Sequence, residues 1–271
     1  ITSTHNDQSI DADADCQAIL PDYIGDVLAT DNCDATLNIV QSPVAGTALA
    51  GATNNITLTV TDDNGNSSQV SFNVAVVDNT DPVITSIHND QSIDADADCQ
   101  ATVPDYTGDV IATDNCDASL DISQSPVAGS VISGSTNEVI LTVTDDLGNS
   151  AQISFNVAVV DNTDPVITST HNDQSIDADA DCQATVPDYT GDVTATDNCD
   201  ASLDISQSPV AGSVISGSTN EVILTVTDDL GNSAQISFNV AVVDNTDPVI
   251  TSTHNDQSID ADADCQAILP D

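Results

Sequence analysis

The stretch EVILTVTDDLGNSAQISFNVAVVD, residues 138–161, contains two β-rich runs on either side of the turn Leu147-Gly148-Asn149. Apolar residues occupy every second position of both runs, namely Val139, Leu141 and Val143 in the first and Ile153, Phe155, Val157 and Val159 in the second. A period of two is typical of a half-buried strand, and a glycine-containing turn between two such runs indicates a hairpin. The stretch therefore predicts two antiparallel strands with one face turned to a core.

The same hairpin pattern returns because the whole chain is a tandem repeat. The motif that begins at Ile1 begins again at Ile84, Ile167 and Ile250, a period of 83 residues, and residues 250–271 match residues 1–22. Periodicity of this kind is typical of repeat architectures. We expect four repeats: residues 1–80, with a truncated start, residues 81–163, residues 164–246, and a partial repeat at residues 247–271.

Each repeat is too rich in turns and too poor in helical periodicity for anything but a small β domain. Upstream of the hairpin, PVITSI, QSIDAD, CQATVPDY and LDISQSP are expected strands, separated by turn-forming segments such as TGDV and TDNCDAS. About seven short strands in 83 residues predict an all-β fold of tandem immunoglobulin-like β-sandwiches. The short DNTDP linkers, with a φ-restricting proline, favour an extended rod in which each repeat adds roughly 35–45 Å.

The charge of the chain is extreme and of one sign. There are 45 acidic residues and no lysine or arginine, so the formal net charge is −45. This excludes nucleic acid and anionic membrane surfaces as electrostatic partners. No apolar run reaches the ~18 residues of a membrane span, so no membrane insertion is expected in this segment. Clustered aspartates must spread apart, stay in water or share a cation, because two carboxylates 4 Å apart repel by about 4 kcal/mol.

The cysteines follow the repeat. They form pairs 17 residues apart, Cys16 with Cys33, Cys99 with Cys116 and Cys182 with Cys199, followed by Cys265. A disulfide within each pair is the simplest framework and indicates an oxidising, extracellular compartment. The alternative is a zinc or redox site, but no C-x-x-C motif supports it.

The order of these motifs makes the repeat resemble the hyalin repeat (HYR) module, an immunoglobulin-like family of extracellular adhesion proteins. The matching segments are DNTDPVI, DADADCQATV, ATDNCD, QSPVAG, LTVTDDLGN and SFNVAVVD, in that order and in every complete repeat. Near-identical, aspartate-rich tandem units without lysine are also similar to the giant surface adhesins of gliding Bacteroidetes. The resemblance implies an extracellular or cell-surface protein.

In a sandwich of this order, the N-terminal linker, the B–C loop and the F–G turn lie at one pole. Their oxygen-bearing side chains are candidate calcium ligands, because calcium takes six to eight oxygens. For the second repeat the candidates are Asp78, Asn79, Asp81, Asp114, Asp117, Asp145 and Asp146; for the third they are Asp161, Asn162, Asp164, Asp197, Asp200, Asp228 and Asp229. The alternative is that Asp and Asn are simply good turn residues.

A second candidate is DADAD, in which Asp94, Asp96 and Asp98 have the spacing of an EF-hand start. As an EF-hand it fails, since Cys99 stands where that loop has glycine. An outward-facing turn at the opposite pole is the other interpretation. The recurring histidine has no nucleophile near it in sequence, so neither a triad nor an enzyme is expected.

Two functions remain. The first is a structural segment of a long extracellular adhesin or surface filament that projects or displays adhesive regions, in attachment and gliding motility, with neighbouring repeats of the same chain as partners. The second is a multivalent module whose individual repeats bind a glycan or protein, with avidity from repetition. The scarcity of aromatic residues, 2% of the chain, argues against glycan-stacking platforms.

Overall fold

The computed structural model describes residues 1–269 of the chain. It divides into two compact units, Ile1–Asn162, which holds the first two repeats, and the part from Thr163 onward. The last two residues of the predicted partial repeat, 270 and 271, lie outside the described residues. Hydrogen-bonded strands always belong to the same 83-residue repeat.

The described residues form strands and three short 3₁₀ helices. The first repeat contains β1 (Gln8–Asp11), β2 (Ala18–Ile19), η1 (Ile24–Asp26), β3 (Asn38–Ser42), β4 (Ala48–Leu49), β5 (Asn54–Thr61) and β6 (Ser67–Val77). The second contains β7 (Val83–Ile84), β8 (Gln91–Asp94), β9 (Ala101–Thr102), η2 (Thr107–Asp109), β10 (Ala112–Thr113), β11 (Asp121–Ser125), β12 (Val131–Ile132), β13 (Asn137–Thr144) and β14 (Ser150–Val160). The third contains β15 (Val166–Ile167), β16 (Gln174–Asp177), β17 (Gln183–Thr185), η3 (Thr190–Asp192), β18 (Ala195–Thr196), β19 (Asp204–Ser208), β20 (Val214–Ser216), β21 (Asn220–Thr227) and β22 (Ser233–Val243).

The predicted hairpin is confirmed as β13 and β14, which pair antiparallel with Val139 opposite Phe155 and Leu141 opposite Ile153. The alternation places one face in the core, where Val139 and Leu141 are 0% exposed. At the turn Gly148 has φ of 92°, a conformation that glycine adopts without steric cost. The hairpin is the centre of each repeat's main sheet.

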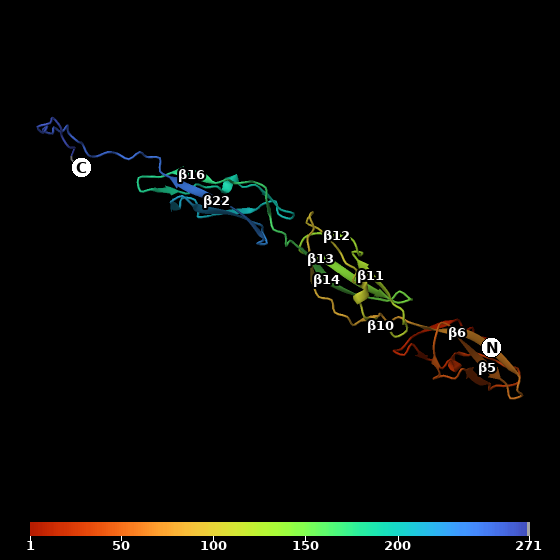
Figure 1. Cartoon of the computed structure of the whole chain (residues 1–271). Helices are drawn as coiled ribbons and strands as arrows, with labels where there is room; N and C mark the ends of the chain where they lie inside the picture. Colours follow the sequence, from red (N-terminus) through yellow and green to blue (C-terminus); the bar gives the residue numbers. More distant parts are fainter. Residues whose placement is uncertain (270–271) are drawn as a thin grey trace. The chain divides into compact units, whose positions relative to one another are not determined.

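That main sheet has four strands, in the order β11-β13-β14-β8 in the second repeat. β11, β13 and β14 correspond to strands C, F and G of an immunoglobulin-like sandwich, and β8 adds to the edge in parallel with β14. The first and third repeats have the same order, and β16 and β22 lie side by side in Figure 1. The all-β, immunoglobulin-like prediction is therefore confirmed.

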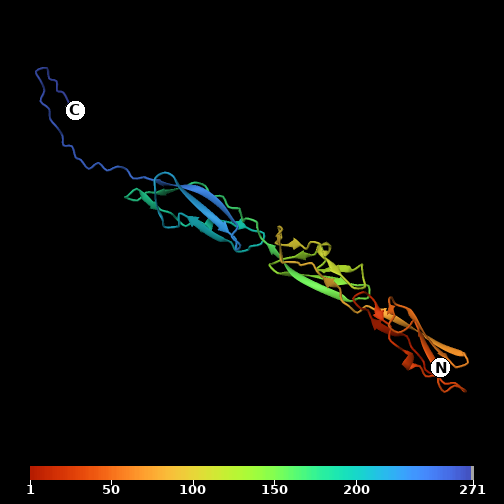
Figure 2. The same ribbon diagram turned by 90° about the horizontal axis from the view of Figure 1, so that it is seen from below.

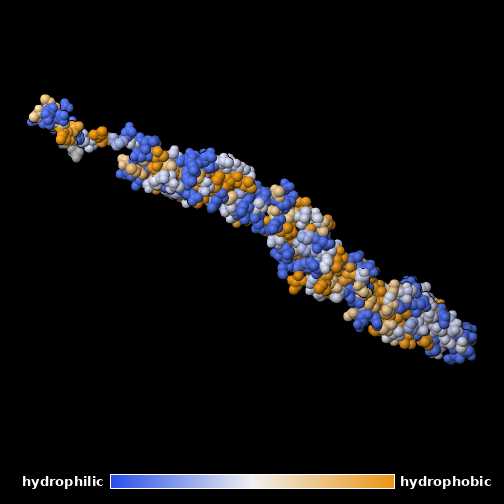
Figure 3. Space-filling view, in the orientation of Figure 1, coloured by the Kyte–Doolittle hydropathy of each residue, from blue (hydrophilic) through white to orange (hydrophobic). Residues whose placement is uncertain are grey.

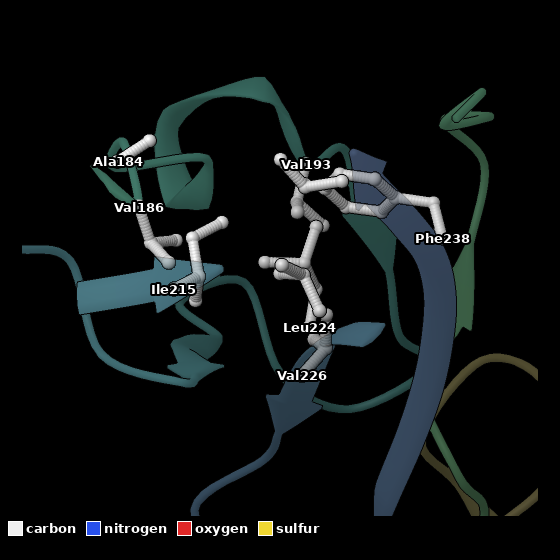
Figure 4. Packing of buried hydrophobic residues seen from close by; sticks show 9 residues of the cluster. Ala184, Val186, Val193, Ile215, Leu224, Val226 and Phe238 are labelled. Carbon is white, nitrogen blue, oxygen red and sulfur yellow. The ribbon is translucent and has the colours of Figure 1, made fainter. Parts of the chain in front are cut away.

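A second, smaller layer covers the main sheet. In the third repeat β17 pairs with β20, and Ala184 and Ile215 from this pair belong to the same buried cluster as Leu224 and Phe238 of the main sheet (Figure 4). The first and second repeats have equivalent clusters of buried apolar residues. Each of the three repeats therefore has its own core, built from both layers.

Two polar features complete each core. Gln124 is 9% exposed, and its side chain accepts a hydrogen bond from the Tyr106 amide at 2.8 Å and donates one to the Pro104 carbonyl at 2.9 Å. His88 stacks on Phe155 with ring centroids 5.3 Å apart. Its two ring nitrogens are buried without a hydrogen-bond partner.

After Val243 the described chain, through residue 269, forms no strand, and Figure 2 shows this segment as a coil. On the face seen in Figure 3, hydrophobic and hydrophilic residues are interspersed over the repeats. Within residues 1–269 there is no helix with the length and apolar character needed to cross a membrane.

Candidate metal centre

The first component of the candidate centre is Asp114, in the segment between β10 and β11 that forms the B–C loop of the second repeat. Its Oδ1 accepts hydrogen bonds from the backbone amides of Cys116 and Asp117, both at 2.9 Å. Aspartate commonly folds a loop in this way, by bonding to amides a few residues ahead. The local turn thus fixes the carboxylate and leaves its Oδ2 uncommitted.

The second component is Asp145, in the turn of the hairpin. Its Oδ1 accepts from the amides of Leu147 at 2.9 Å and Asn149 at 2.8 Å, and its Oδ2 accepts from the Asn149 side chain at 2.6 Å. Burial alone would raise the pKa of Asp145, but the hydrogen bonds from Asn149, Leu147 and Gly148 outweigh it and lower the pKa below its ordinary value. The turn therefore holds a carboxylate that stays ionised.

The third component is Asp78, which follows the last strand of the first repeat. Its Oδ1 accepts from the Thr80 amide at 3.0 Å, and its backbone carbonyl accepts from the Asn149 side chain at 3.1 Å. Asn149 thus contacts both Asp78 and Asp145, and couples the linker to the hairpin turn. The centre is shared between two repeats that lie in the same compact unit.

These three elements bring one carboxylate oxygen each from Asp78, Asp114 and Asp145 to within 4.8 Å of one another. Asp78 and Asp145 are both only 6% exposed. Each pair of such charges repels by about 3 kcal/mol at an effective dielectric constant near 20. The chain contains no lysine or arginine to compensate.

Two buried oxygens at the junction lack partners. Asp114 Oδ2 and the neighbouring Asn115 Oδ1 are buried, and neither has a hydrogen bond. A cavity of about 190 Å³ adjoins the cluster, lined by Asp78, Cys116, Asp117, Asp145, Asp146 and Leu147. Buried oxygens are almost always satisfied in folded proteins, so orphaned ones point to an ion or water. An oxygen-only, anionic set of this kind suits a hard cation such as calcium.

The other residues predicted as ligands in the second repeat take part in hydrogen bonds at the same pole. Asn79 donates to Asp11 Oδ1 at 2.7 Å, and Asp81 Oδ1 accepts from the Ser150 amide at 3.1 Å. Asp117 Oδ2 accepts from the Asp146 amide at 2.7 Å. Asp81, Asp117 and Asp146 are not in the group of three close carboxylates, although Asp117 and Asp146 line the adjoining cavity.

The third repeat folds the same loops in the same way. Asp197 Oδ1 accepts from the amides of Cys199 and Asp200, and its Oδ2 is buried without a hydrogen bond. Asp228 Oδ1 accepts from the amides of Leu230 and Asn232.

The remaining candidates of the third repeat match their counterparts as well. Asp200 Oδ2 accepts from the Asp229 amide at 2.6 Å, and Asp164 Oδ1 accepts from the Ser233 amide at 3.1 Å. Asn162 donates to Asp94 Oδ1 at 2.7 Å, and Asp161 is buried.

The first repeat contains a cluster that the sequence analysis missed. Oxygens of Asp31, Asp34 and Asp62 lie within 4.8 Å of one another. These residues stand 83 positions before Asp114, Asp117 and Asp145, so the repeat period was the signal that would have found them.

The DADAD motif behaves as a turn. Asp96 Oδ1 accepts from the amides of Asp98 and Gln100, both at 2.9 Å, and Cys99 has φ of 57°. Cysteine therefore adopts the left-handed conformation that glycine provides in an EF-hand. Among the described residues, no group of three close metal-ligating side chains includes this motif.

The predicted disulfide pairing is wrong. Cys16 bonds to Cys116, 100 residues away in the next repeat, with Cα atoms 4.8 Å apart. Cys33 and Cys182 are free and exposed, so neither the Cys16–Cys33 nor the Cys182–Cys199 pair exists.

The physical reason lies in the sandwich. The turn that holds Cys16 faces the second repeat, and β2 leads the chain away from it. The 17 residues from Cys16 to Cys33 therefore run along the repeat and do not form a loop that a disulfide closes. The predicted Cys99–Cys116 pair is also wrong, because Cys116 is bonded to Cys16. Cys99 and Cys199 are each disulfide-bonded as well. At the Cys16–Cys116 junction Asn115 also donates to the Asp13 carbonyl at 3.0 Å.

Comparisons with known proteins agree with the repeat. No family model matches the chain. It is similar to hyalin of Strongylocentrotus purpuratus, with 29% identity over 234 residues, covering 84% of this chain and 19% of the relative. It is also similar to hyalin of Lytechinus variegatus, with 29% identity over 209 residues, covering 75% of this chain and 39% of the relative. The chain thus spans well under half the length of either relative.

Similar solved structures include immunoglobulin domains 1–4 of Sidekick-1, with a TM-score of 0.36 and 11% identity over 89% of this chain and 74% of that chain. Another is the I67–I69 fragment of titin, with a TM-score of 0.38 and 9% identity over 78% of this chain and 89% of that chain. These scores are too low to carry an argument, so the fold assignment rests on the sheets themselves. Together with those sheets, the similarity to the two hyalins supports a hyalin-repeat-like, immunoglobulin-like module as the unit that this chain repeats.

Proposed function

We propose that this chain is a structural segment of a long, repetitive extracellular adhesin or surface filament, and that its work is to project or display adhesive regions. The observation that carries the proposal is the joint between the first two repeats. A disulfide, a hydrogen bond from Asn115 to Asp13 and a shared acidic cluster all connect them. A chain of independent binding modules needs none of these connections, whereas a stalk that transmits force does.

The proposal assigns calcium to the joint. Asp78, Asp114 and Asp145 would hold the ion, with Asn115 Oδ1 as a further oxygen within the same loop. Bound calcium offsets carboxylate repulsion and links the linker, the B–C loop and the F–G turn. The resulting joint resists bending, because these three segments belong to two different repeats.

In this proposal the repeats comprise residues 1–80, 81–163, 164–246 and 247–271. An extracellular location follows from the disulfide, since such bonds persist in oxidising compartments. Attachment and gliding motility, the role suggested by the resemblance to bacterial surface adhesins, is the specific setting that we propose for this rod.

Small-angle scattering and thermal unfolding of the full chain test the proposal. Both are measured in 2 mM calcium, in EDTA, and in EDTA with dithiothreitol, at about 0.15 M sodium chloride so that long-range repulsion is screened. We expect the melting temperature to fall and the distribution of dimensions to broaden from the first condition to the third. An unchanged melting temperature and unchanged dimensions in all three conditions would contradict both the ion and the stiff joint.

A further inference from the structure

Residues 84–166 and 167–249 of the chain are identical except at two positions. Ile87 and Ile111 of the second repeat stand where the third repeat has Thr170 and Thr194. The Ser86 amide donates to the Ile111 carbonyl at 3.3 Å, and the Ile111 amide donates to Ser86 Oγ at 3.1 Å. Because Ser86 directly precedes Ile87, the two differences lie on neighbouring segments at one place on the repeat.

Both differences expose apolar surface. Ile87 is 86% exposed and Ile111 is 65% exposed. In the third repeat Thr194 Oγ1 shares a hydrogen bond with Thr168 Oγ1 at 2.9 Å, which isoleucine cannot make. Single exposed apolar side chains are ordinary on a protein surface. Two neighbouring ones that account for every difference between two copies indicate contact with another molecule.

A cleft of about 300 Å³ lies beside the first of these positions, and its lining includes Ile87, His88, Tyr106, Asp109 and Phe155. The ring of Phe155 stacks with His88 and meets Tyr106 edge to face, with centroids 5.3 Å and 5.0 Å away. These three rings are the only histidine, tyrosine and phenylalanine of the second repeat. The cleft therefore gathers the aromatic residues of an otherwise aromatic-poor repeat.

The cleft also carries a charge and an unsatisfied polar group. The Asp109 amide donates to the Tyr106 carbonyl at 3.1 Å, so η2 places an exposed carboxylate next to the ring. Burial, and then the negative charge of Asp109, raise the pKa of Tyr106 above its ordinary value. Both ring nitrogens of His88 are buried without a hydrogen-bond partner, and such atoms are almost always satisfied in folded proteins. Both features favour a polar, cationic ligand.

Arginine has the chemistry that fits this lining. Its planar guanidinium stacks on aromatic rings and donates to carboxylates, and its aliphatic stem packs on apolar surface. None of the 271 residues is lysine or arginine, so the group has to come from a partner, which the net charge of −45 attracts. A free amine would leave Ile87 and Ile111 uncovered, whereas a protein segment carries apolar neighbours that cover them.

We propose that the second repeat binds an arginine side chain of a partner protein in this cleft, and that an apolar residue beside the arginine packs on Ile87 and Ile111. Asp109 accepts hydrogen bonds from the guanidinium, and Tyr106 supplies the aromatic wall. The isoleucine pair makes the second repeat bind more tightly than the third, whose other residues are the same.

Nuclear magnetic resonance of the full chain with ring-labelled tyrosine tests the proposal. The chain has one tyrosine in each of its first three repeats, so Tyr106 reports on the second and Tyr189 on the third. The probe is acetyl-leucyl-arginyl-leucine amide, at about 0.15 M sodium chloride so that long-range attraction is screened. The Tyr106 signals should give a dissociation constant roughly tenfold lower than the Tyr189 signals, a difference of about 1.4 kcal/mol. The same peptide with citrulline, a neutral isostere of arginine, should shift neither signal.

The third repeat supplies the matched variant. Ile87→Thr/Ile111→Thr gives residues 84–166 the sequence of residues 167–249, which form the same sheets, so the fold is retained. The response of Tyr106 to the arginine peptide should fall to that of Tyr189.

The converse variant should gain the site. Thr170→Ile/Thr194→Ile should raise the response of Tyr189 to that of Tyr106. Asp109→Asn, which keeps the size of the side chain and removes its charge, should weaken the Tyr106 response roughly tenfold. Each variant should keep the wild-type melting temperature, which the same samples report.

Equal responses of Tyr106 and Tyr189 in wild type would overturn the proposal, as would binding of the citrulline peptide as tight as that of the arginine peptide. Agmatine, which has the guanidinium and stem alone, should bind more weakly than the arginine peptide. Equal affinity would show a small-amine site and overturn the protein partner. The cleft shares no residue with the cluster of Asp78, so its failure would leave the calcium response of the proposed joint unchanged.

Discussion

Replacing Asp114 with asparagine should stabilise the chain without calcium and make it less responsive to calcium. Asparagine keeps the Oδ1 that accepts from the Cys116 and Asp117 amides. It replaces the orphaned Oδ2 with an NH₂ group that can donate to the neighbouring carboxylates. The substitution therefore changes charge and hydrogen bonding at the cluster while leaving the turn intact.

The magnitude follows from the geometry. Asp114 forms two of the three charge pairs within 4.8 Å. Each pair repels by about 3 kcal/mol at an effective dielectric constant near 20, and the partial exposure of Asp114 reduces the total to about 3 kcal/mol. For wild type, calcium at 100 times its dissociation constant adds about 2.7 kcal/mol to the free energy of unfolding. The difference in the free energy of unfolding between Asp114→Asn and wild type should therefore shrink or change sign when calcium is added.

The assay is urea unfolding followed by far-ultraviolet circular dichroism, in EDTA and in calcium. Asp121→Asn is the matched control, because Asp121 is exposed at the start of β11. This substitution removes the same charge at a position outside the cluster. The control should respond to calcium like wild type. The reasoning is refuted if Asp114→Asn is less stable than wild type in EDTA, or if its response to calcium equals that of wild type.

Three further outcomes are expected. The free energy of unfolding of the double variant Cys16→Ser/Cys116→Ser should be lower by about 4–5 kcal/mol in the chain-entropy model, because the bond joins residues 100 positions apart. An unchanged urea midpoint would show that the bond is dispensable. Gln124→Leu should lower the free energy of unfolding by about 2–4 kcal/mol, because it removes the hydrogen-bond partner of the Tyr106 amide and of the Pro104 and Pro126 carbonyls. A loss under about 0.5 kcal/mol would rule out this role. Hydrogen bonds hold the pKa of Asp145 below its ordinary value of 3.8 despite burial, so the ionised form favours the folded state. Its contribution to the free energy of unfolding is complete above about pH 5 and is lost as pH falls through 3.8 toward the folded pKa. Asn149→Ala should make the free energy of unfolding depend less on pH in this acid range than in wild type. Parallel curves of stability against pH for the two proteins would contradict this role.

Much of the local structure follows from the sequence alone. Strict alternation in residues 138–161 determines a hairpin with Val139 and Leu141 inside, because a strand presents successive side chains to opposite faces. The 83-residue period predicts that the sheets and loops recur, and they do. Part of the candidate centre could also be predicted from the sequence, because immunoglobulin-like topology places the linker, the B–C loop and the F–G turn at one pole.

The tertiary structure decided which atoms meet. Seven candidates per junction could be named from sequence, but only Asp78, Asp114 and Asp145 form the close group in the second repeat. Asp81 and Asp117 accept hydrogen bonds from backbone amides, and Asn79 donates to the carboxylate of Asp11. Which carboxylates remain close together depends on loop conformations that composition does not encode. Cys16 bonds to Cys116 because the two turns lie at facing ends of consecutive repeats. Distance in space across the joint, and not the separation of 17 residues between Cys16 and Cys33, therefore decides the pairing.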